Sequence, residues 1–435
     1  MSVPVIDDPL TYLFSLEQFG IKFGLENIRT LLDRLDHPER AFHSVHVAGT
    51  NGKGSVTAMV DAALCAAGHR SGRYTSPHLI DLAERFVIDG RPVERAALVG
   101  AVADVRAAID GLCATGALRA PPTFFEVTTA VAFDLFRRAG VDLAVVEVGL
   151  GGRLDATNVI TPVASAITSI AFDHQQYLGA TLYDIAREKA GIIKPGVRVI
   201  VGALPPEALA AIEDAARECG AELIRASEGV TVGMVRLTPD HSIIRLRTPA
   251  RDYGEIDLAL AGAHQVANAV VAVRLLEEVD ARGIGVPPDA VVHGLANVCW
   301  PGRLDRRTLP DGRELILDAA HNPAGAAALA AYLAGDGGET LPLVFAAMRD
   351  KDVRGMFHAL LPRVGALVVT RASNRRTMEP DALAAAARAV APTTEVEIVP
   401  SIDEALDAAW RKSRRIVVAG SIFLVGDVLK RIGGS

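Results

Sequence analysis

The 435-residue chain has little cysteine and few aromatic residues. Its four cysteines, at positions 65, 113, 219 and 299, form no CxxC pair, which argues against a disulfide framework or a zinc site. We expect them to be small buried apolar residues. Aromatic residues make up only 5% of the chain, while alanine and valine are abundant. This composition favours helices packed on parallel strands over a β-sandwich.

An excess of positive charge is also missing. Lysine and arginine number 45 against 52 aspartate and glutamate, a net charge of -7. This balance argues against binding to nucleic acid or to a membrane surface. The N-terminus lacks the basic and apolar regions of a secretory signal. The longest uncharged stretch, 156–172, contains Thr157, Asn158 and Pro162 and indicates a buried strand, not a membrane span. We expect a cytoplasmic monomer.

Apolar runs alternate with helical patterns along most of the chain, which predicts an α/β fold. A Pro-Gly pair at 301–302 indicates a boundary. We therefore expect two domains: residues 1–298, a P-loop-type mostly parallel sheet with helices on both faces, and residues 299–435, a smaller Rossmann-like α/β domain. Strands are expected at 44–48, 143–148, 163–170, 314–317, 341–345, 366–370, 395–399 and 415–419, helices at 55–67, 125–139 and 182–190, and a hairpin at 230–248.

A glycine-rich loop lies between the expected strand at 44–48 and the helix at 55–67. Backbone N–H groups that converge at a helix N-terminus bind anions, and glycines let the phosphate approach closely. A lysine in the loop adds a full charge toward the β/γ phosphates, and a hydroxyl can approach a metal. The spacing departs from the Walker A pattern, and a glycine follows the lysine. A surface turn is the alternative, but we predict ATP binding by Gly49, Thr50, Asn51, Gly52, Lys53, Gly54 and Ser55.

Further motifs follow in order: TSPHL at 75–79, EVGLGGRLDATN at 147–158, TSIAFDH at 168–174, EKAGIIK at 188–194, GAHQVANA at 262–269, PGRL at 301–304 and LDAAHNP at 317–323. Together with the loop, they resemble the ATP-dependent Mur ligase superfamily, specifically its folate branch of folylpolyglutamate synthase and dihydrofolate synthase. The matches span nearly the whole chain. The resemblance implies ATP as co-substrate, two Mg²⁺ ions and a monovalent cation such as K⁺.

Glu147 stands at the carboxyl end of an expected parallel strand, where open α/β sheets bind ligands. A carboxylate beside a phosphate loop is a natural Mg²⁺ ligand, although such a residue can also cap a neighbouring helix. The resemblance implies the metal role, with Ser76 as a second ligand. It also implies that His174 binds a second magnesium and that Lys189 is carbamylated. Taken alone, a histidine such as His174 is more often structural than a ligand, and Lys189 would ordinarily be a solvated helix residue.

The remaining site predictions come from the resemblance. Asn268 matches an adenine contact, Arg303 and Asp318 match residues that reach the nucleotide, and His321 and Ser421 match substrate contacts. Helix capping by the neighbouring His264 or Gln265 stays an alternative.

The acyl substrate is predicted from the glycine-rich segment after Glu147. A buried carboxylate such as Asp155 can hydrogen-bond the amino-pyrimidine edge of a pterin. Phe124 is as consistent with a pterin stack as with a core aromatic. The Asp155-Ala156 pair, Phe124 and residues 22–26 resemble the bacterial bifunctional enzymes.

These residues imply a ligase that activates the carboxylate of 7,8-dihydropteroate or a folylpolyglutamate as an acyl phosphate and joins it to L-glutamate. A monofunctional folylpolyglutamate synthase and a non-enzymatic nucleotide-binding switch are the alternatives. A switch would need the loop but neither Glu147 nor the second-domain residues.

Overall fold

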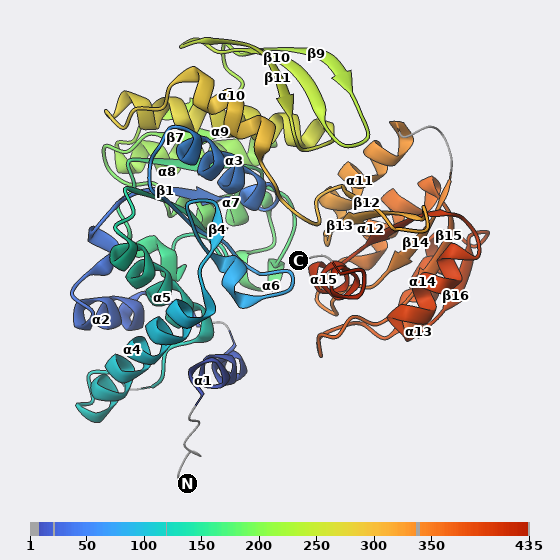
Figure 1. Ribbon diagram of the computed structural model, residues 1–435, viewed down its shortest axis with the longest axis horizontal. Helices are drawn as coiled ribbons and strands as arrows, with labels where there is room; N and C mark the ends of the chain where they lie inside the picture. The colour runs from blue at the N-terminus through green and yellow to red at the C-terminus, as the bar shows by residue number, and fades with distance from the viewer. Residues whose placement is uncertain (1–7, 21, 119, 336–339, 434–435) are drawn as a thin grey trace.

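The computed structural model describes residues 8–20, 22–118, 120–335 and 340–433. Two α/β units lie side by side, the first running to residue 297 and the second starting at residue 305 (Figure 1). They are called here the N-terminal part and the C-terminal part. The expected boundary at 298/299 falls in the segment that links them.

The N-terminal part is built on an eight-stranded sheet in the order β4-β3-β2-β5-β1-β6-β7-β8. The six strands from β2 to β8 in this order are parallel, and β3 and β4 add an antiparallel edge. The bounds are β1 (His43–Ala48), β2 (Ser71–Tyr74), β3 (Phe86–Ile88), β4 (Arg91–Pro92), β5 (Leu143–Glu147), β6 (Ala164–Ile167), β7 (Val199–Val201) and β8 (Leu223–Arg225).

Helices cover both faces of this sheet because its central strands are apolar on both sides. Val45, Val47 and Val145 pack toward one helical layer, and Ala144 and Val146 pack toward the other. The first layer holds α3 (Lys53–Ala66), α9 (Ala263–Ala281) and α10 (Pro288–Asn297). The opposite face carries α1 (Pro9–Ser15), α2 (Glu26–Arg34), α4 (Arg95–Ala114), α5 (Phe124–Ala139), α7 (Leu182–Ala190) and α8 (Pro206–Cys219), and α6 (Gln175–Leu178) precedes α7.

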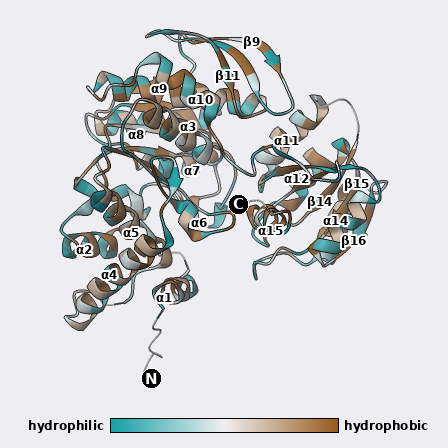
Figure 2. Ribbon diagram, viewed as in Figure 1, coloured by the Kyte–Doolittle hydropathy of each residue, from teal (hydrophilic) through white to brown (hydrophobic). Residues whose placement is uncertain are grey.

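A separate antiparallel sheet of three strands follows, in the order β11-β10-β9. The expected hairpin corresponds to β9 (Thr231–Leu237) and β10 (Ser242–Arg247), but the third strand, β11 (Asp252–Leu258), was not predicted. The apolar side of β10 and β11 joins the core under α9 and α10. The edge strand β9 exposes Val232, Met234, Val235 and Leu237, and it carries hydrophobic stretches in Figure 2.

The C-terminal part has a six-stranded sheet in the order β12-β13-β17-β14-β15-β16, parallel except for β12. Its strands are β12 (Asp305–Thr308), β13 (Glu314–Asp318), β14 (Leu341–Phe345), β15 (Val364–Val369), β16 (Glu395–Ile398) and β17 (Arg415–Ala419). One face packs against α11 (Pro323–Gly335), α12 (Val353–Leu360) and α13 (Pro380–Val390), and the other against α14 (Ile402–Trp410) and α15 (Ile422–Arg431).

The predicted elements are confirmed with small shifts at their ends; the expected strand at 163–170, for example, is β6 at Ala164–Ile167. The prediction of buried cysteines is wrong, since Cys113 and Cys299 are exposed and the other two are half-buried. These four thiols lie on helices or in the linker at positions where packing against the core is incomplete. Within the described ranges, no helix has the length and apolar character needed to cross a membrane.

Candidate active site

The phosphate loop joins β1 to α3, as predicted, and its glycines are required by close contacts. A Cβ atom on Gly49 would lie 2.0 Å from Thr168 Oγ1, and one on Gly52 would lie 2.4 Å from Asn268 Oδ1. Gly52 also has a φ of +86°, a conformation that side chains disfavour. Asn268, the predicted adenine contact at the start of α9, therefore packs directly on the turn that begins α3.

The loop is fixed from the segment that follows β6. Thr50 N donates to the Ser169 carbonyl at 2.7 Å, and Asn51 N donates to Ser169 Oγ at 3.0 Å. Thr168 Oγ1 donates back to the Asn51 carbonyl at 2.7 Å. Both segments follow the carboxyl ends of adjacent strands, so hydrogen bonds from the segment after β6 fix the conformation of the loop.

Two lysines converge on the Gly49 carbonyl. Lys53 Nζ donates to it at 3.1 Å and Lys189 Nζ donates to it at 2.9 Å. Lys189 is buried on α7, and burial together with the charge of Lys53 lowers its pKa to about 7. Ser55 is buried in the first turn of α3. The base of the loop thus carries the charge of Lys53 and, when protonated, that of Lys189, which suits a polyphosphate.

Glu147 ends β5 beside this loop. Its carboxylate accepts a hydrogen bond from Ser76 N at 3.2 Å. Burial raises the pKa of Glu147, and the charges of Lys53 and Arg303 and the Ser76 N–H oppose that rise. Among the described residues no group of three His, Cys, Asp or Glu side chains is arranged to hold a metal by itself. A carboxylate at this position fits Mg²⁺, which takes oxygen ligands and commonly completes its shell with substrate phosphates.

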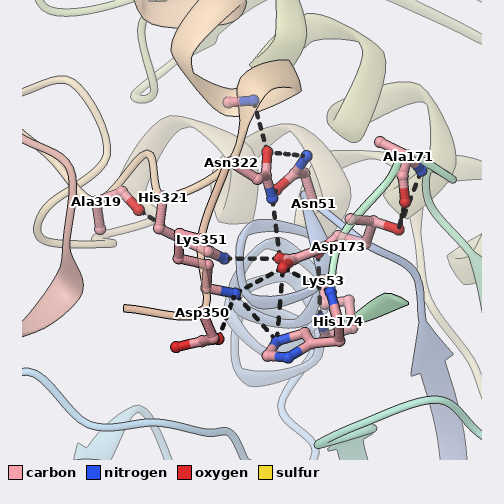
Figure 3. Close-up of polar contacts among 12 residues, drawn as sticks. Asn51, Lys53, Ala171, Asp173, His174, Ala319, His321, Asn322, Asp350 and Lys351 are labelled. Carbon is pink, nitrogen blue, oxygen red and sulfur yellow. Dashed lines mark hydrogen bonds and ion pairs between the residues drawn. The ribbon is translucent and has the colours of Figure 1, made fainter. Parts of the chain in front are cut away.

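A polar cluster closes the site from the C-terminal part (Figure 3). Asp173, just after β6, accepts from Lys351 Nζ at 2.6 Å and from Asn322 Nδ2 at 3.2 Å. His321 Nε2 lies 3.4 Å from the same carboxylate. Asn322 also exchanges hydrogen bonds with Asn51 of the phosphate loop, at 2.9 and 3.2 Å. Burial raises the pKa of Asp173, but His321, Lys351 and His174 outweigh it and hold that pKa well below its usual range.

His174 starts α6 with a left-handed backbone, φ +52°, and lies beside Asp173. Its Nε2 is 3.3 Å from Lys351 Nζ. Burial and the charge of Lys351 lower its pKa to about 4, against the effect of Asp173, so the ring is neutral at pH 7 and its nitrogen keeps a lone pair.

The other predicted nucleotide contacts lie on the C-terminal side. Asp318, at the end of β13, accepts from Leu304 N at 2.9 Å and from Ala320 N at 2.8 Å. It therefore holds the turn that carries Arg303. Burial lowers the pKa of Arg303, and the nearby charges of Asp318 and Glu147 act in the opposite direction. His321 and Asp318 thus share a short segment at the carboxyl edge of the second sheet.

Three predicted substrate residues have clear structural partners inside the chain. Asp155 accepts from Leu150 N at 2.8 Å with one oxygen and from Thr157 N at 3.0 Å with the other. Ser421 is the N-cap of α15. Ala156 is buried in the 3₁₀ turn Ala156–Val159. Their roles toward substrate stay predictions.

Phe124 begins α5 and is half-buried. Its ring stacks on Phe14 at 6.0 Å between centroids, and the Arg85 guanidinium lies 5.2 Å from the ring centroid. The ring also packs against the core beneath α5. Both interpretations of Phe124, pterin stack and core aromatic, therefore stay open.

Sequence reasoning missed three residues of the cluster. Asp173 and Asn322 stand only inside the motifs at 168–174 and 317–323, with no role assigned to them, and Lys351 lies in none of the motifs. Each follows the carboxyl end of a parallel strand, β6, β13 or β14. That placement, applied to every charged or amide residue at a strand end, was the signal that could have found them.

Comparison with known proteins agrees with these motifs. Residues 102–276 match the Mur ligase middle domain, and residues 302–422 match the Mur ligase glutamate ligase domain. A Mycobacterium tuberculosis protein named dihydrofolate synthase/folylpolyglutamate synthase is 39% identical over 94% of this chain and 86% of its own. The chain belongs to the Mur ligase family.

Two solved structures extend the likeness to three dimensions. Folylpolyglutamate synthase of M. tuberculosis complexed with ADP and AMPPCP has a TM-score of 0.90 at 36% identity, covering 98% of this chain and 99% of that one. E. coli FolC in complex with DHPP and ADP has a TM-score of 0.86 at 29% identity, covering 99% of both. The predicted α/β architecture is confirmed. The chain is an ATP-dependent ligase of the dihydrofolate synthase/folylpolyglutamate synthase group.

Proposed function

We propose that this ligase carries out both reactions of its group: it joins 7,8-dihydropteroate to L-glutamate, and it lengthens the glutamyl tail of folates. The observation that supports it best is the convergence of Lys53 and Lys189 on the Gly49 carbonyl, next to buried Glu147. That arrangement suits transfer of a phosphoryl group. Of the proposed pterin-side residues, Asp155 lies in the segment that follows Glu147, and Phe124 begins α5.

The reaction proceeds in two steps in this proposal. A carboxylate oxygen of the acyl substrate attacks the γ-phosphorus of ATP, the bond to ADP breaks, and an acyl phosphate forms. The amine of glutamate then attacks the acyl carbon, phosphate leaves, and the nitrogen gives up a proton. Lys53 stabilises charge on the transferred group. The contacts of Asn322 and Lys351 with Asn51 and Asp173 close the site against water that would hydrolyse the intermediate.

The remaining residues have roles in binding. Asn268 contacts adenine, Arg303 and Asp318 approach the nucleotide, and His321 and Ser421 approach glutamate. The chain divides into domains 1–298 and 299–435, which move relative to one another, and the protein works as a cytoplasmic monomer. Neither nucleic acid nor a membrane is a partner.

Metal binding follows from the donor types. Glu147 and Ser76 would hold one Mg²⁺ and His174, with its neutral ring, a second. A monovalent cation such as K⁺ is also proposed. Bound Mg²⁺ supplies charge neutralisation on the phosphates. Lys189 is buried with a pKa of about 7, so much of it is an uncharged amine at neutral pH, the form that reacts with CO₂ to give a carbamate.

A substrate panel tests the proposal. Purified protein with ATP, Mg²⁺ and glutamate is given either 7,8-dihydropteroate or tetrahydrofolate, and ADP and the glutamylated products are quantified. Turnover of both substrates is expected. Extension of tetrahydrofolate alone would favour the monofunctional alternative and refute the dihydrofolate synthase activity.

Substitution of Glu147 by glutamine separates ligase from nucleotide switch. We expect at least a ~100-fold loss of turnover, as for removal of other groups that stabilise transition-state charge, with ATP still bound. Glu213→Gln is a matched control, because Glu213 lies on α8 in a surface ion pair with Arg225. Full activity of Glu147→Gln would refute the metal assignment.

A further inference from the structure

The phosphate loop contains one glycine that the loop's own backbone conformation does not require. Gly54 follows Lys53 inside α3, and its φ is negative, so no turn demands it. A Cβ atom there would lie 2.5 Å from Cζ2 and 2.9 Å from Cε2 of Trp300. Gly54 is therefore a seat for an indole ring that comes from the segment between the two parts of the molecule.

The indole of Trp300 packs on residues of the N-terminal part. The Arg73 guanidinium, from β2, lies 5.2 Å from the Trp300 ring centroid. Arg73 in turn pairs with Asp61 of α3 at 3.1 Å, and Asp61 accepts from Ser71 Oγ at 2.6 Å. The indole thus packs on the first turn of α3 and beside a cation that is itself tied to α3. Trp300 is therefore anchored on the helix that the phosphate loop begins.

Two residues later the chain belongs to the C-terminal part. Ala319 N donates to the Gly302 carbonyl at 2.9 Å, and Gly302 N donates to Asp305 at 3.2 Å. Gly302 has a φ of +72°, which only a glycine adopts readily. A single residue, Pro301, separates the anchor on α3 from the anchor on β13 and β12.

Arg303 follows at once, and its guanidinium lies where the charges of both Asp318 and Glu147 act on it. Its distance from the phosphate loop is therefore set through a very short path: α3, the indole of Trp300, Pro301 and Gly302. Without the Trp300 contact, Arg303 would still be held on the C-terminal side by Asp318 through Leu304 N. Its distance from α3 would then depend on contacts made elsewhere, such as that of Asn322 with Asn51.

We infer that Trp300 is a positioning residue, which by seating its indole on Gly54 sets Arg303 against the phosphate loop. This rests on the proposed nucleotide contact of Arg303. It accounts for Gly54, the residue at which the loop departs from the Walker A pattern. It also distinguishes Trp300 from an ordinary core residue, whose loss would lower stability without acting through Arg303.

A double-mutant cycle on the full chain tests the inference. The dissociation constant of a non-hydrolysable ATP analogue with Mg²⁺ is measured by calorimetry for the wild type, Trp300→Ala, Arg303→Ala and the double variant. We expect each single change to weaken binding ~10-fold, within the usual range of coupling between sites. Because both act through one contact, the double variant should be no more than ~2-fold weaker than Arg303→Ala, instead of the ~100-fold expected for independent effects.

Further variants separate positioning from stability. Trp300→Phe should restore most of the affinity, since a phenyl ring can occupy the seat. Trp410→Ala is the matched control: the other tryptophan packs against Arg313 in the C-terminal part and should leave nucleotide affinity unchanged. Gly54→Ala should weaken binding in the wild type but much less in Trp300→Ala, where the clashing indole is gone.

The outcomes are distinguishable. A wild-type protein that fails to bind the analogue would refute the proposed function and not the coupling. Binding by the wild type with multiplicative effects of the two substitutions would overturn the inference, as would a Trp300→Ala variant that loses thermal stability but keeps its affinity. Unchanged affinity of Arg303→Ala would also overturn it.

Discussion

Lys189→Met should make this protein more stable and inactive at the same time. Lys189 is 5% exposed, and its amine lies 2.9 Å from the Gly49 carbonyl, which Lys53 also contacts. Its charge therefore has little water around it and a second ammonium nearby. Methionine has a similar length, fills the same space on α7 and carries no charge.

The size of the effect follows from the pKa of Lys189, which burial and Lys53 lower from 10.5 to about 7. At ~1.4 kcal/mol per pKa unit, keeping the charged amine in the folded state costs ~5 kcal/mol. The lost hydrogen bond to Gly49 returns ~1 kcal/mol of that. We expect Lys189→Met to raise the free energy of unfolding by ~2–4 kcal/mol at pH 7.

The pH dependence has a definite sign. Below pH 7 the lysine is protonated in both the folded and the unfolded chain, so its full destabilising effect is present. Between the folded pKa of about 7 and the unfolded value of 10.5, the unfolded chain binds more protons, so wild-type stability rises with pH relative to the variant. Above 10.5 the two should converge.

Urea unfolding of both proteins in CO₂-free buffer from pH 6 to pH 9 measures this difference. The gap between variant and wild type should narrow by ~1.4 kcal/mol per pH unit above pH 7. Bicarbonate should stabilise only the wild type if a carbamate forms. A difference that stays flat from pH 7 to pH 9 in CO₂-free buffer would refute the reasoning.

Three further substitutions have defined outcomes. Gly49→Ala places a methyl group 2.0 Å from Thr168 Oγ1 and should abolish ATP binding, whereas Gly68→Ala, where φ is also positive but space is open, should retain it in the same calorimetric assay. Lys351→Met breaks an ion pair with Asp173 in which both side chains are only 8% exposed. The free energy of unfolding should fall by ~2 kcal/mol above pH 4. This loss should shrink below pH 4, because Asp173, whose pKa is low in the folded state, becomes protonated first in the unfolded chain. Asp155→Asn sets an amide N–H₂ against a backbone N–H and should lower the free energy of unfolding, measured with urea, by ~1–3 kcal/mol. An unchanged free energy of unfolding would contradict the capping role of Asp155.

The elements that position the site were predictable because their signals are local. The apolar run of β1, the glycine loop and the start of α3 lie within a dozen residues, and Glu147 follows directly from the buried strand β5. The third strand of the small sheet was missed because the alternation in β11 is interrupted at Gly254, between buried Tyr253 and Ile256, and the strand contains two aspartates.

Contacts between distant segments were not predictable in the same way. Lys351 meets Asp173 across 178 residues, and Asn322 meets Asn51 across 271. No single-sequence pattern pairs such positions. Conversely, Asp155 and Ser421 were predicted to bind substrate, while the structure gives both a helix-capping role. A motif residue can hydrogen-bond to the rest of the chain and to a ligand at the same time. Only the lone pairs that the chain leaves unused tell whether it can also bind a ligand.

The charge distribution explains how an acidic chain can bind anionic substrates. The net charge of -7 belongs to the whole surface, whereas Lys53, Lys189 and Arg303 lie at the phosphate loop or across from Glu147. Each of these cations comes from a different element, α3, α7 or the segment after α10. Burial and the nearby charge of Lys53 lower the pKa of Lys189, so the fold limits how much positive charge the site holds. The linker then determines whether Arg303 adds to that charge. The contact of Trp300 with Gly54 therefore affects the electrostatics of the site as well as its geometry.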